Sequence, residues 1–105
     1  MQVAGIDQGT TSTRVLKLNA KGEPQVIHAV KHQQFYPREG WVEHDPEELV
    51  ANVIACIDAV GPVDAIGIDN QGESCLAWDA ITKKALTPVL VWQDSRTLEQ
   101  IEKLK

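Results

Sequence analysis

The chain has 105 residues, 43% of them hydrophobic, which is enough for one domain with a modest core. Its 10 basic and 15 acidic side chains give a net charge of −5, and no basic cluster is longer than Lys83-Lys84, which argues against a nucleic-acid groove or an anionic membrane as the main partner. No apolar run approaches the roughly 20 residues that span a bilayer, and the first residues lack a signal-peptide pattern. We therefore expect a cytoplasmic protein.

The first third of the chain predicts three strands. Residues 2–7 and 12–18 flank a polar turn, and residues 25–34 follow a second turn cluster at 19–22. The proline and glycine within residues 36–40 end the third strand.

A helix is predicted to begin at Pro46. Asp45 is placed to cap it, Pro46 suits the first helical position, and Glu48 completes a capping box. Gly61-Pro62 ends the helix. The apolar residues between these ends recur at helical spacing and predict one apolar face, made of Leu49, Val50, Val53, Ile54, Ile57 and Val60.

The remainder predicts three strands and a second helix. Residues 63–69 form an almost continuous apolar run, which suits a strand covered on both faces. Residues 74–79 and 89–92 predict two shorter strands, and the last helix begins at Asp94 or Ser95. Its apolar stripe is still running at the last residue, so we expect a partial chain, with a docked terminal helix as the alternative.

The two cysteines are far apart and belong to different predicted elements. Cys56 lies in the first helix and Cys75 in the strand at 74–79. This placement predicts two buried free thiols rather than a disulfide.

The predicted helices and strands alone indicate a mixed α/β fold.

The turn between the first two strands carries the most specific chemistry. Gly9 lets the backbone approach a phosphate, which the neighbouring N–H groups and hydroxyls can bind. Asp7 could hold a hydrated Mg²⁺, and Arg14 adds a permanently charged phosphate donor. A β-hairpin with a Thr/Ser-rich turn is the competing interpretation. The segment reads Asp7-Gln8-Gly9-Thr10-Thr11-Ser12-Thr13-Arg14.

This turn resembles the first phosphate loop of the FGGY carbohydrate kinases, and of the glycerol kinase branch in particular. Three further segments agree with that family in order and spacing, so the four motifs span nearly the whole chain. They are Gly40-Trp41-Val42-Glu43-His44-Asp45-Pro46, Gly67-Ile68-Asp69-Asn70-Gln71-Gly72-Glu73 and Val91-Trp92-Gln93-Asp94-Ser95-Arg96-Thr97.

The resemblance implies an α/β fold with the ribonuclease-H-like core of the actin/sugar-kinase/Hsp70 superfamily. Residues 1–105 would be the N-terminal portion of the first domain, with a mixed sheet and flanking helices. The rest of that domain and a second domain would lie outside them.

The resemblance also implies a reaction, the transfer of the γ-phosphate of ATP to a hydroxyl of a small polyol or sugar. ATP and Mg²⁺ would be the cofactors, with no nucleic-acid or membrane partner, and homo-oligomer formation by the full-length protein stays open. The implied general base lies beyond residue 105, so we expect the segment alone to be inactive. A ketose or longer-polyol kinase, or a non-catalytic nucleotide-binding domain, are the alternatives.

By position, the resemblance assigns roles in the phosphate loop. Asp7 corresponds to the Mg²⁺-associated carboxylate. Thr10, Thr11 and Ser12 correspond to phosphate contacts, and Arg14 to a guanidinium near the nucleotide phosphates. Thr13 is expected to be an ordinary strand residue.

On the substrate side, Glu73 resembles a carboxylate that accepts hydrogen bonds from substrate hydroxyls, and Trp92 resembles a tryptophan that covers the carbon side of a polyol. A solvated turn glutamate and a core tryptophan are the alternatives. Gly72 departs from the pattern, because glycerol kinases carry an arginine there. Gly72 therefore predicts a wider, less positive pocket that suits a longer polyol or a sugar. Ser95 also replaces a basic residue.

The other polar and aromatic residues receive structural roles or none. Trp41 and Trp78 are expected to be structural. Asp94 is expected to cap the second helix, with a substrate-side role for Asp94 and Arg96 as the alternative. The three histidines, at positions 28, 32 and 44, show no metal-ligand spacing and predict no role.

Overall fold

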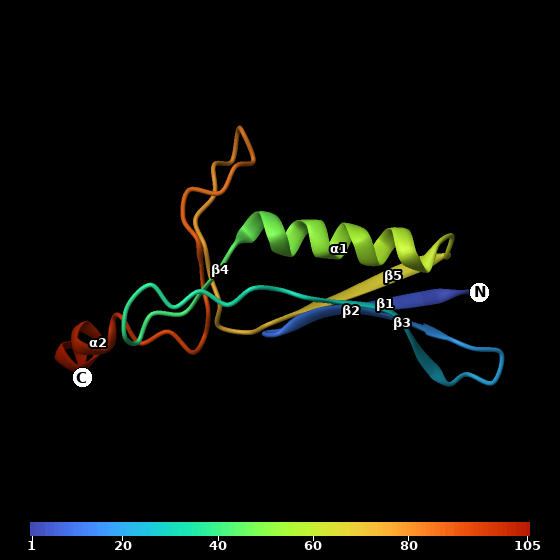
Figure 1. Ribbon diagram of the computed structural model, residues 1–105, viewed down its shortest axis with the longest axis horizontal. Coiled ribbons are helices and arrows are strands. Elements are labelled where there is room, and N and C mark those ends of the chain that lie inside the picture. Colours follow the sequence, from blue (N-terminus) through green and yellow to red (C-terminus); the bar gives the residue numbers. More distant parts are fainter.

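A four-stranded sheet with one long helix on its face forms the larger part of the computed structural model, which describes residues 1–105 (Figure 1). Strand β2 pairs antiparallel with both β1 and β3. Strand β5 pairs parallel with β1, on the side of β1 away from β2. The sheet is therefore mixed, as predicted. In spatial order the strands are β3 (Pro24–Lys31), β2 (Ser12–Leu18), β1 (Val3–Gln8) and β5 (Ala65–Asn70).

Helix α1 (Pro46–Val60) begins and ends where the sequence predicts. The Asp45 side chain accepts a hydrogen bond from the Glu47 N–H at 2.9 Å, and Pro46 lies in the first turn. The predicted capping box is not formed, because Glu48 Oε1 instead accepts from the Gln33 N–H at 2.7 Å. Gly61 ends the helix with φ of 69°, a conformation that glycine adopts at little cost.

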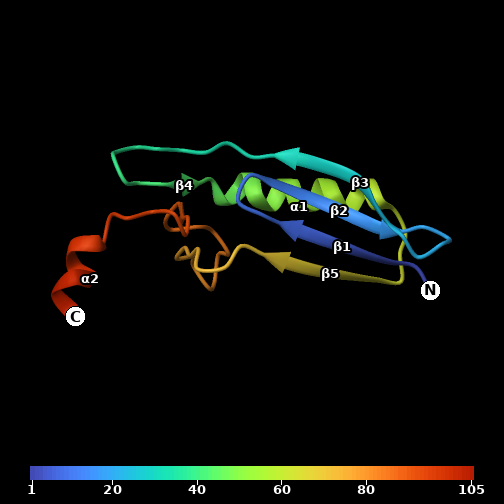
Figure 2. The same cartoon turned by 90° about the horizontal axis from the view of Figure 1, so that it is seen from below.

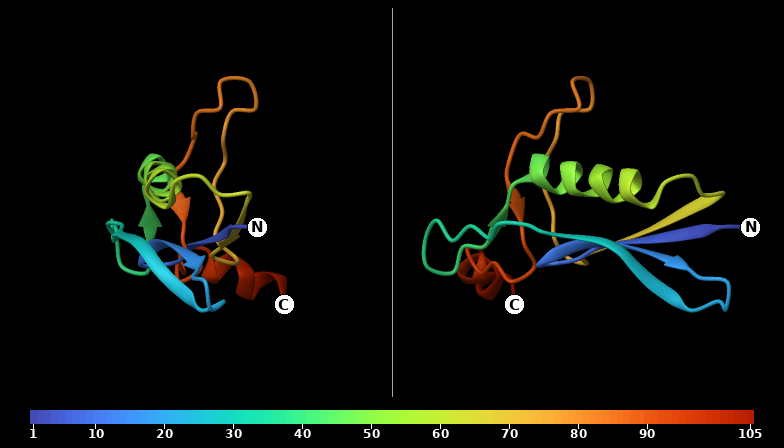
Figure 3. Two further views of the ribbon diagram at one scale, coloured as in Figure 1. Left: turned by 90° about the vertical axis from the view of Figure 1, so that its right-hand side faces the viewer. Right: turned by 45° about the vertical axis from the view of Figure 1, so that its right-hand side comes forward.

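The core lies between α1 and the first two strands. Ala4, Ile6 and Val15 of the sheet pack with Cys56 and Val60 of the helix. Figure 3 shows α1 above one face of the sheet, seen end-on in its left view. This face of α1 is narrower than the predicted apolar stripe.

Three residues of the predicted stripe, Val50, Ile54 and Ile57, are exposed at 56%, 52% and 38%. The prediction of one buried face was therefore wrong on that side. The flat sheet contacts only the side of α1 that carries Asn52, Cys56 and Val60.

Strand β5 is the edge of the sheet, and all six of its residues are exposed. The prediction that its apolar run is covered on both faces was wrong for this chain. Helix α1 contacts β1, β2 and β3, so it lies away from β5 (Figure 2). Ile68 is consequently 61% exposed.

The C-terminal third is extended and carries little regular structure. Strands β4 (Glu43–His44) and β6 (Val89–Leu90) form a two-stranded ladder. Helix α2 (Leu98–Leu104) lies at the far end of the molecule from the N-terminus (Figure 1). No helix in the structure has the length and apolar character that crossing a membrane requires.

Three predictions for this third were wrong. Residues 74–79 form only isolated bridges, Cys75 with Leu90 of β6 and Trp78 with Ala85, so the predicted strand is not formed. Cys75 is therefore exposed, although both cysteines are free as expected. Helix α2 begins at Leu98 rather than at Asp94 or Ser95, because the Asp94 carboxylate is bonded elsewhere.

Candidate functional site

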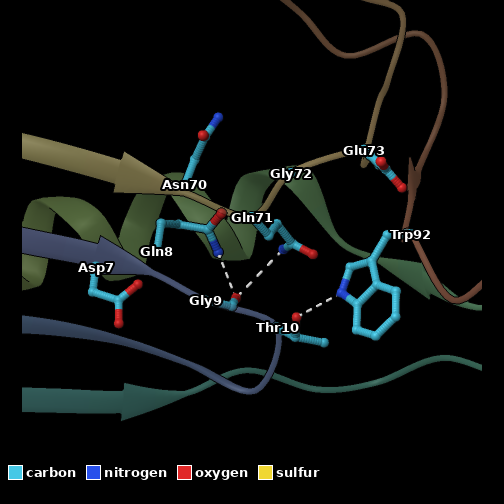
Figure 4. A pocket seen from close by; sticks show the side chains of 9 residues that line it. All are labelled: Asp7, Gln8, Gly9, Thr10, Asn70, Gln71, Gly72, Glu73 and Trp92. Atoms are coloured by element: carbon cyan, nitrogen blue, oxygen red, sulfur yellow. Dashed lines mark hydrogen bonds between the residues drawn. The ribbon is translucent and has the colours of Figure 1, made fainter.

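The carboxyl ends of β1 and β5 meet at one edge of the sheet, because the two strands run parallel with Asp7 opposite Asp69 and Gln8 opposite Asn70. Ligands of open α/β sheets commonly bind at this edge. A cavity of about 350 Å³ opens here (Figure 4). Its lining consists of Asp7, Gln8, Gly9, Thr10, Asn70, Gln71, Gly72, Glu73 and Trp92.

The loop between β1 and β2 contributes Gly9 and Thr10 to the lining of this cavity. The Gly9 N–H donates to Ser12 O at 2.9 Å and closes the turn, whereas the N–H groups of Thr10 and Thr11 have no backbone acceptor. A Cβ at Gly9 would lie 3.2 Å from Ser12 O, so a larger residue would fit only if that carbonyl shifted. The loop therefore has the tight backbone and the free donors that a phosphate requires.

Asp7 and Arg14 form an ion pair. Arg14 Nη2 lies 2.9 Å from Asp7 Oδ2, and the two residues are direct partners across β1 and β2. Their side chains are 40% and 47% exposed, so the pair is open to solvent and to ligands. Asp7 lines the cavity and Arg14 does not. The guanidinium thus neutralises the carboxylate in the absence of a ligand.

The three candidate phosphate contacts differ in their surroundings. Thr10 lines the cavity, and its Oγ1 accepts a 2.8 Å hydrogen bond from Trp92 Nε1. Thr11 is exposed and lies outside the cavity lining, as does Ser12. Thr13 is buried in β2, as expected of an ordinary strand residue. Figure 4 shows the indole of Trp92 reaching over Thr10.

Glu73, Gly72 and Trp92 line the other side of the cavity. Glu73 has φ of 63°, an uncommon conformation for a residue with a side chain. A Cβ at Gly72 would meet nothing within 4 Å, so a side chain can begin at this position without a clash. The structure thus brings Asp7, Thr10 and all three predicted substrate-side residues to one cavity.

A buried polar layer lies behind the phosphate loop, and the sequence analysis gave it no role. His32 Nε2 lies 3.0 Å from Gly9 O and 2.9 Å from Thr10 O, so this nitrogen must carry the proton and donate. His44 is fully buried, with its ring centroid 4.8 Å from that of His32. Burial and the neighbouring His32 lower the pKa of His44, while Glu48 opposes this shift.

The only sequence signal for this layer was the polar run that follows β3. His32, Gln33 and Gln34 fall at the end of the strand predicted over residues 25–34, and a run of polar residues does not itself indicate burial. His28, in contrast, is exposed on β3.

Arg96 is the centre of a second cluster of polar side chains, outside the cavity lining. Its guanidinium lies 2.7 Å from Asp94 Oδ2 and 2.8 Å from Glu43 Oε2, and it stacks 3.9 Å from the centroid of the Trp41 ring. The hydrogen bonds from Arg96, together with the Val42 N–H, lower the pKa of Asp94 to about 2. The interpretation of Asp94 as a helix cap was wrong. These contacts fit a structural role for Trp41.

The cluster and Trp78 both stand apart from the cavity. Neither Asp94 nor Arg96 belongs to its lining. Trp78 is 53% exposed and packs under Lys83, whose Nζ lies 5.1 Å from the ring centroid.

The residues present fit a magnesium ion only together with a phosphate ligand. No group of three or more His, Cys, Asp or Glu side chains is arranged to hold a metal ion. Mg²⁺ usually takes one or two protein carboxylates and completes its shell with water and phosphate oxygens. Asp7, beside the free N–H groups of the loop, matches that donor set.

Comparisons with known proteins agree on one family. The profile of the FGGY family of carbohydrate kinases, N-terminal domain, matches residues 2–105. A glycerol kinase of Saccharopolyspora erythraea is 46% identical over 103 residues, which cover 90% of this chain and 21% of that protein.

Two solved structures share the fold. The crystal structure of Plasmodium falciparum glycerol kinase with ADP superposes with a TM-score of 0.86 at 31% identity, covering 99% of this chain and 22% of that one. A gluconate kinase from Lactobacillus acidophilus has a TM-score of 0.87 at 20% identity, covering 97% and 22%. The chain therefore has the sugar-kinase fold and spans about a fifth of the length of the relatives it matches.

Proposed function

Because the chain belongs to the FGGY family of carbohydrate kinases, we propose that it works as the N-terminal part of an ATP-dependent kinase that phosphorylates a hydroxyl of a small polyol or sugar. One observation carries the proposal. Gly9 and Thr10 of the loop line the same cavity as Glu73 and Trp92, so a phosphate and a hydroxylated carbon chain could lie side by side.

Residues of the loop and of the cavity take different roles in the proposed reaction. The free N–H groups of Thr10 and Thr11 bind a transferring phosphate, and the Thr10 hydroxyl, which accepts from Trp92, keeps its own proton to donate. Glu73 accepts hydrogen bonds from substrate hydroxyls, and the face of Trp92 covers the carbon chain. Asp7 holds the metal with which ATP binds, and that complex supplies the phosphoryl group.

Arg14 acts through Asp7. At 2.9 Å from Asp7 Oδ2, its charge screens that carboxylate from the incoming phosphates. We propose that Ser12 contributes through its carbonyl, which closes the loop, rather than through its hydroxyl. We propose that Thr11 contributes its backbone N–H, which has no backbone acceptor, although Thr11 itself does not line the cavity.

A longer polyol or a ketose is the second candidate substrate, favoured by the open space around the Cβ position of Gly72. The competing class is a nucleotide-binding domain that catalyses nothing. We place the complete protein in the cytoplasm, acting on a small molecule. We also propose that residues 1–105 alone do not catalyse transfer, since no general base is assigned within them.

A substrate panel on the complete protein tests the proposal. Glycerol, longer polyols and ketoses are supplied with ATP and Mg²⁺, and ADP release is measured for each. We expect one of these classes to stimulate ADP release well above the rate without substrate. Binding of ATP with no stimulation by any of them would favour the non-catalytic alternative.

A further inference from the structure

Trp92 and Thr10 are joined twice, once directly and once through four other side chains. The direct link is the 2.8 Å bond from Trp92 Nε1 to Thr10 Oγ1. The second link begins at the Trp92 backbone N–H, which donates to Ser74 Oγ at 3.0 Å, and Ser74 Oγ donates to Gln71 Oε1 at 2.9 Å. Together the two links enclose one wall of the cavity.

The second link continues through a buried histidine. Gln71 Nε2 lies 3.3 Å from His44 Nδ1, His44 Nε2 lies 2.7 Å from Gln34 Oε1, and Gln34 Nε2 donates to Thr10 O at 2.9 Å. We call the six residues Thr10, Gln34, His44, Gln71, Ser74 and Trp92 the hydrogen-bonded ring.

The ring fixes the proton on His44. Because Gln34 uses its amide nitrogen to donate to Thr10 O, its oxygen faces His44 and can only accept. His44 Nε2 must therefore carry the proton. Gln71 then donates to the bare Nδ1, and its oxygen is left to accept from Ser74. Every bond of the second link donates in one direction, from Trp92 to Thr10.

Only the neutral Nε2–H form of His44 satisfies both neighbours. A proton on Nδ1 would face the amide N–H of Gln71, so two donors would meet. Rotating the Gln71 amide would put its oxygen where Nε2 now lies, 3.4 Å from Gly9 O, so two acceptors would meet there. Full burial of the imidazole also disfavours its charged form. His44 therefore accepts from Gln71 and donates to Gln34, and neither bond can reverse its direction.

We propose that His44 and Gln34 are positioning residues, which hold the phosphate loop at Thr10 in register with the substrate wall formed by Gln71 to Glu73 and Trp92. Neither residue lines the cavity. They act through Thr10 and Gln71, which do. The role in substrate binding rests on the proposed kinase function, whereas the ring itself does not.

Nuclear magnetic resonance tests the ring without catalysis. In the complete protein, labelled imidazole nitrogens report the tautomer of His44, with the signal assigned by its loss in His44→Phe. The indole N–H signal of Trp92, assigned by its loss in Trp92→Phe, reports the opposite side of the ring. We expect the neutral Nε2–H tautomer at pH 7 and a shifted Trp92 signal in His44→Phe.

The matched control is His28→Phe, the same change at an exposed histidine, which should leave the Trp92 signal in place. If His44→Phe does not fold, Gln34→Leu breaks the same link, with Gln33→Leu at the exposed neighbour as its control. An Nδ1–H tautomer or an imidazolium, or a Trp92 signal unmoved by Gln34→Leu, would overturn the proposal.

Kinetics test the positioning role. In the complete enzyme we expect Gln34→Leu to raise KM for the polyol roughly tenfold, the effect of one lost hydrogen bond, with a smaller change in kcat. Gln33→Leu should match the unmodified enzyme. Equal KM values for Gln34→Leu and Gln33→Leu would refute positioning. An unmodified protein without any kinase activity would instead refute the proposed function, and the resonance data would still decide whether the ring exists.

Discussion

Trp92 Nε1 donates a 2.8 Å hydrogen bond to Thr10 Oγ1, although the two residues are 82 positions apart in the chain. The bond joins the first turn of the sheet to the segment that follows β6. It places an aromatic side chain and the loop proposed to bind phosphate in contact at one cavity. The two sides of the candidate site are therefore fixed relative to each other by a specific contact.

The first prediction concerns that contact. Thr10→Val removes the hydroxyl while keeping the shape of the side chain, so it should lower kcat/KM of the complete enzyme about tenfold, from the loss of one or two hydrogen bonds. Thr11→Val, the same change at a side chain outside the cavity lining, should have a smaller effect. Equal effects of the two changes would count against a role of the Thr10 hydroxyl.

The second prediction concerns Asp7. Asp7→Asn removes the carboxylate proposed to hold Mg²⁺ and leaves Arg14 without its partner at 2.9 Å. Turnover should fall on the order of a hundredfold or more, while the exposed pair contributes little to folding. The assay is turnover against Mg²⁺ concentration, with Asp58→Asn on the exposed side of α1 as control. Normal turnover at ordinary Mg²⁺ would remove Asp7 from the metal site.

Local signals predicted the strands of the sheet and the ends of the long helix. Apolar runs and turn residues located β1, β2 and β3, and the Asp45-Pro46 pair located the start of α1. Each of these features depends on residues close together in sequence, so sequence patterns can report it.

Features that depend on distant partners were missed. Aspartate is a common helix cap, but the Asp94 carboxylate accepts hydrogen bonds from the Arg96 guanidinium and from the Val42 N–H instead. Val42 lies 52 positions away in the chain. The two buried histidines received no role, because their partners Gly9, Thr10 and Gln71 approach them only in the folded chain. The exposure of Ile54 depends on where the sheet ends, which the helix pattern cannot report.

The third prediction concerns substrate size. Gly72→Arg adds a guanidinium at a position where a side chain can begin without a clash. Its ionic hydrogen bonds to substrate hydroxyls should contribute about 1.5–3 kcal/mol each, which shifts the ratio of kcat/KM toward glycerol by roughly 10- to 100-fold. Steady-state kinetics with glycerol and a longer polyol measure the ratio.

Gly72→Ala is the control, because it adds a side chain without a charge. An unmodified enzyme that already uses glycerol efficiently, together with no response to Gly72→Arg, would show that another residue binds the glycerol hydroxyls.

The fourth prediction concerns stability at low pH. The pKa of Asp94 is lowered from 3.8 to about 2, chiefly by its hydrogen bonds from Arg96. A carboxylate with a lowered pKa stabilises the folded state above its unfolded pKa, and this contribution disappears as the pH falls through the folded value. Asp94→Asn should therefore destabilise the complete protein by a constant amount above about pH 4.

The difference in the free energy of unfolding between the unmodified protein and Asp94→Asn should shrink between about pH 4 and pH 2. Urea unfolding of the unmodified protein and of Asp94→Asn across this range measures it, with Asp58→Asn as the control. A difference that does not change with pH would mean that the Arg96 contacts do not bind the ionised form in preference.

Transfer of the terminal phosphate of ATP is the most direct test of the whole account. The complete protein is incubated with γ-labelled ATP, Mg²⁺ and the polyol or sugar that gives the highest rate of ADP release, and the labelled products are separated. The account predicts a labelled phosphate ester of that substrate, formed far more slowly by Asp7→Asn. Label that stays in ATP, or that appears only as inorganic phosphate whichever polyol or sugar is supplied, would contradict it.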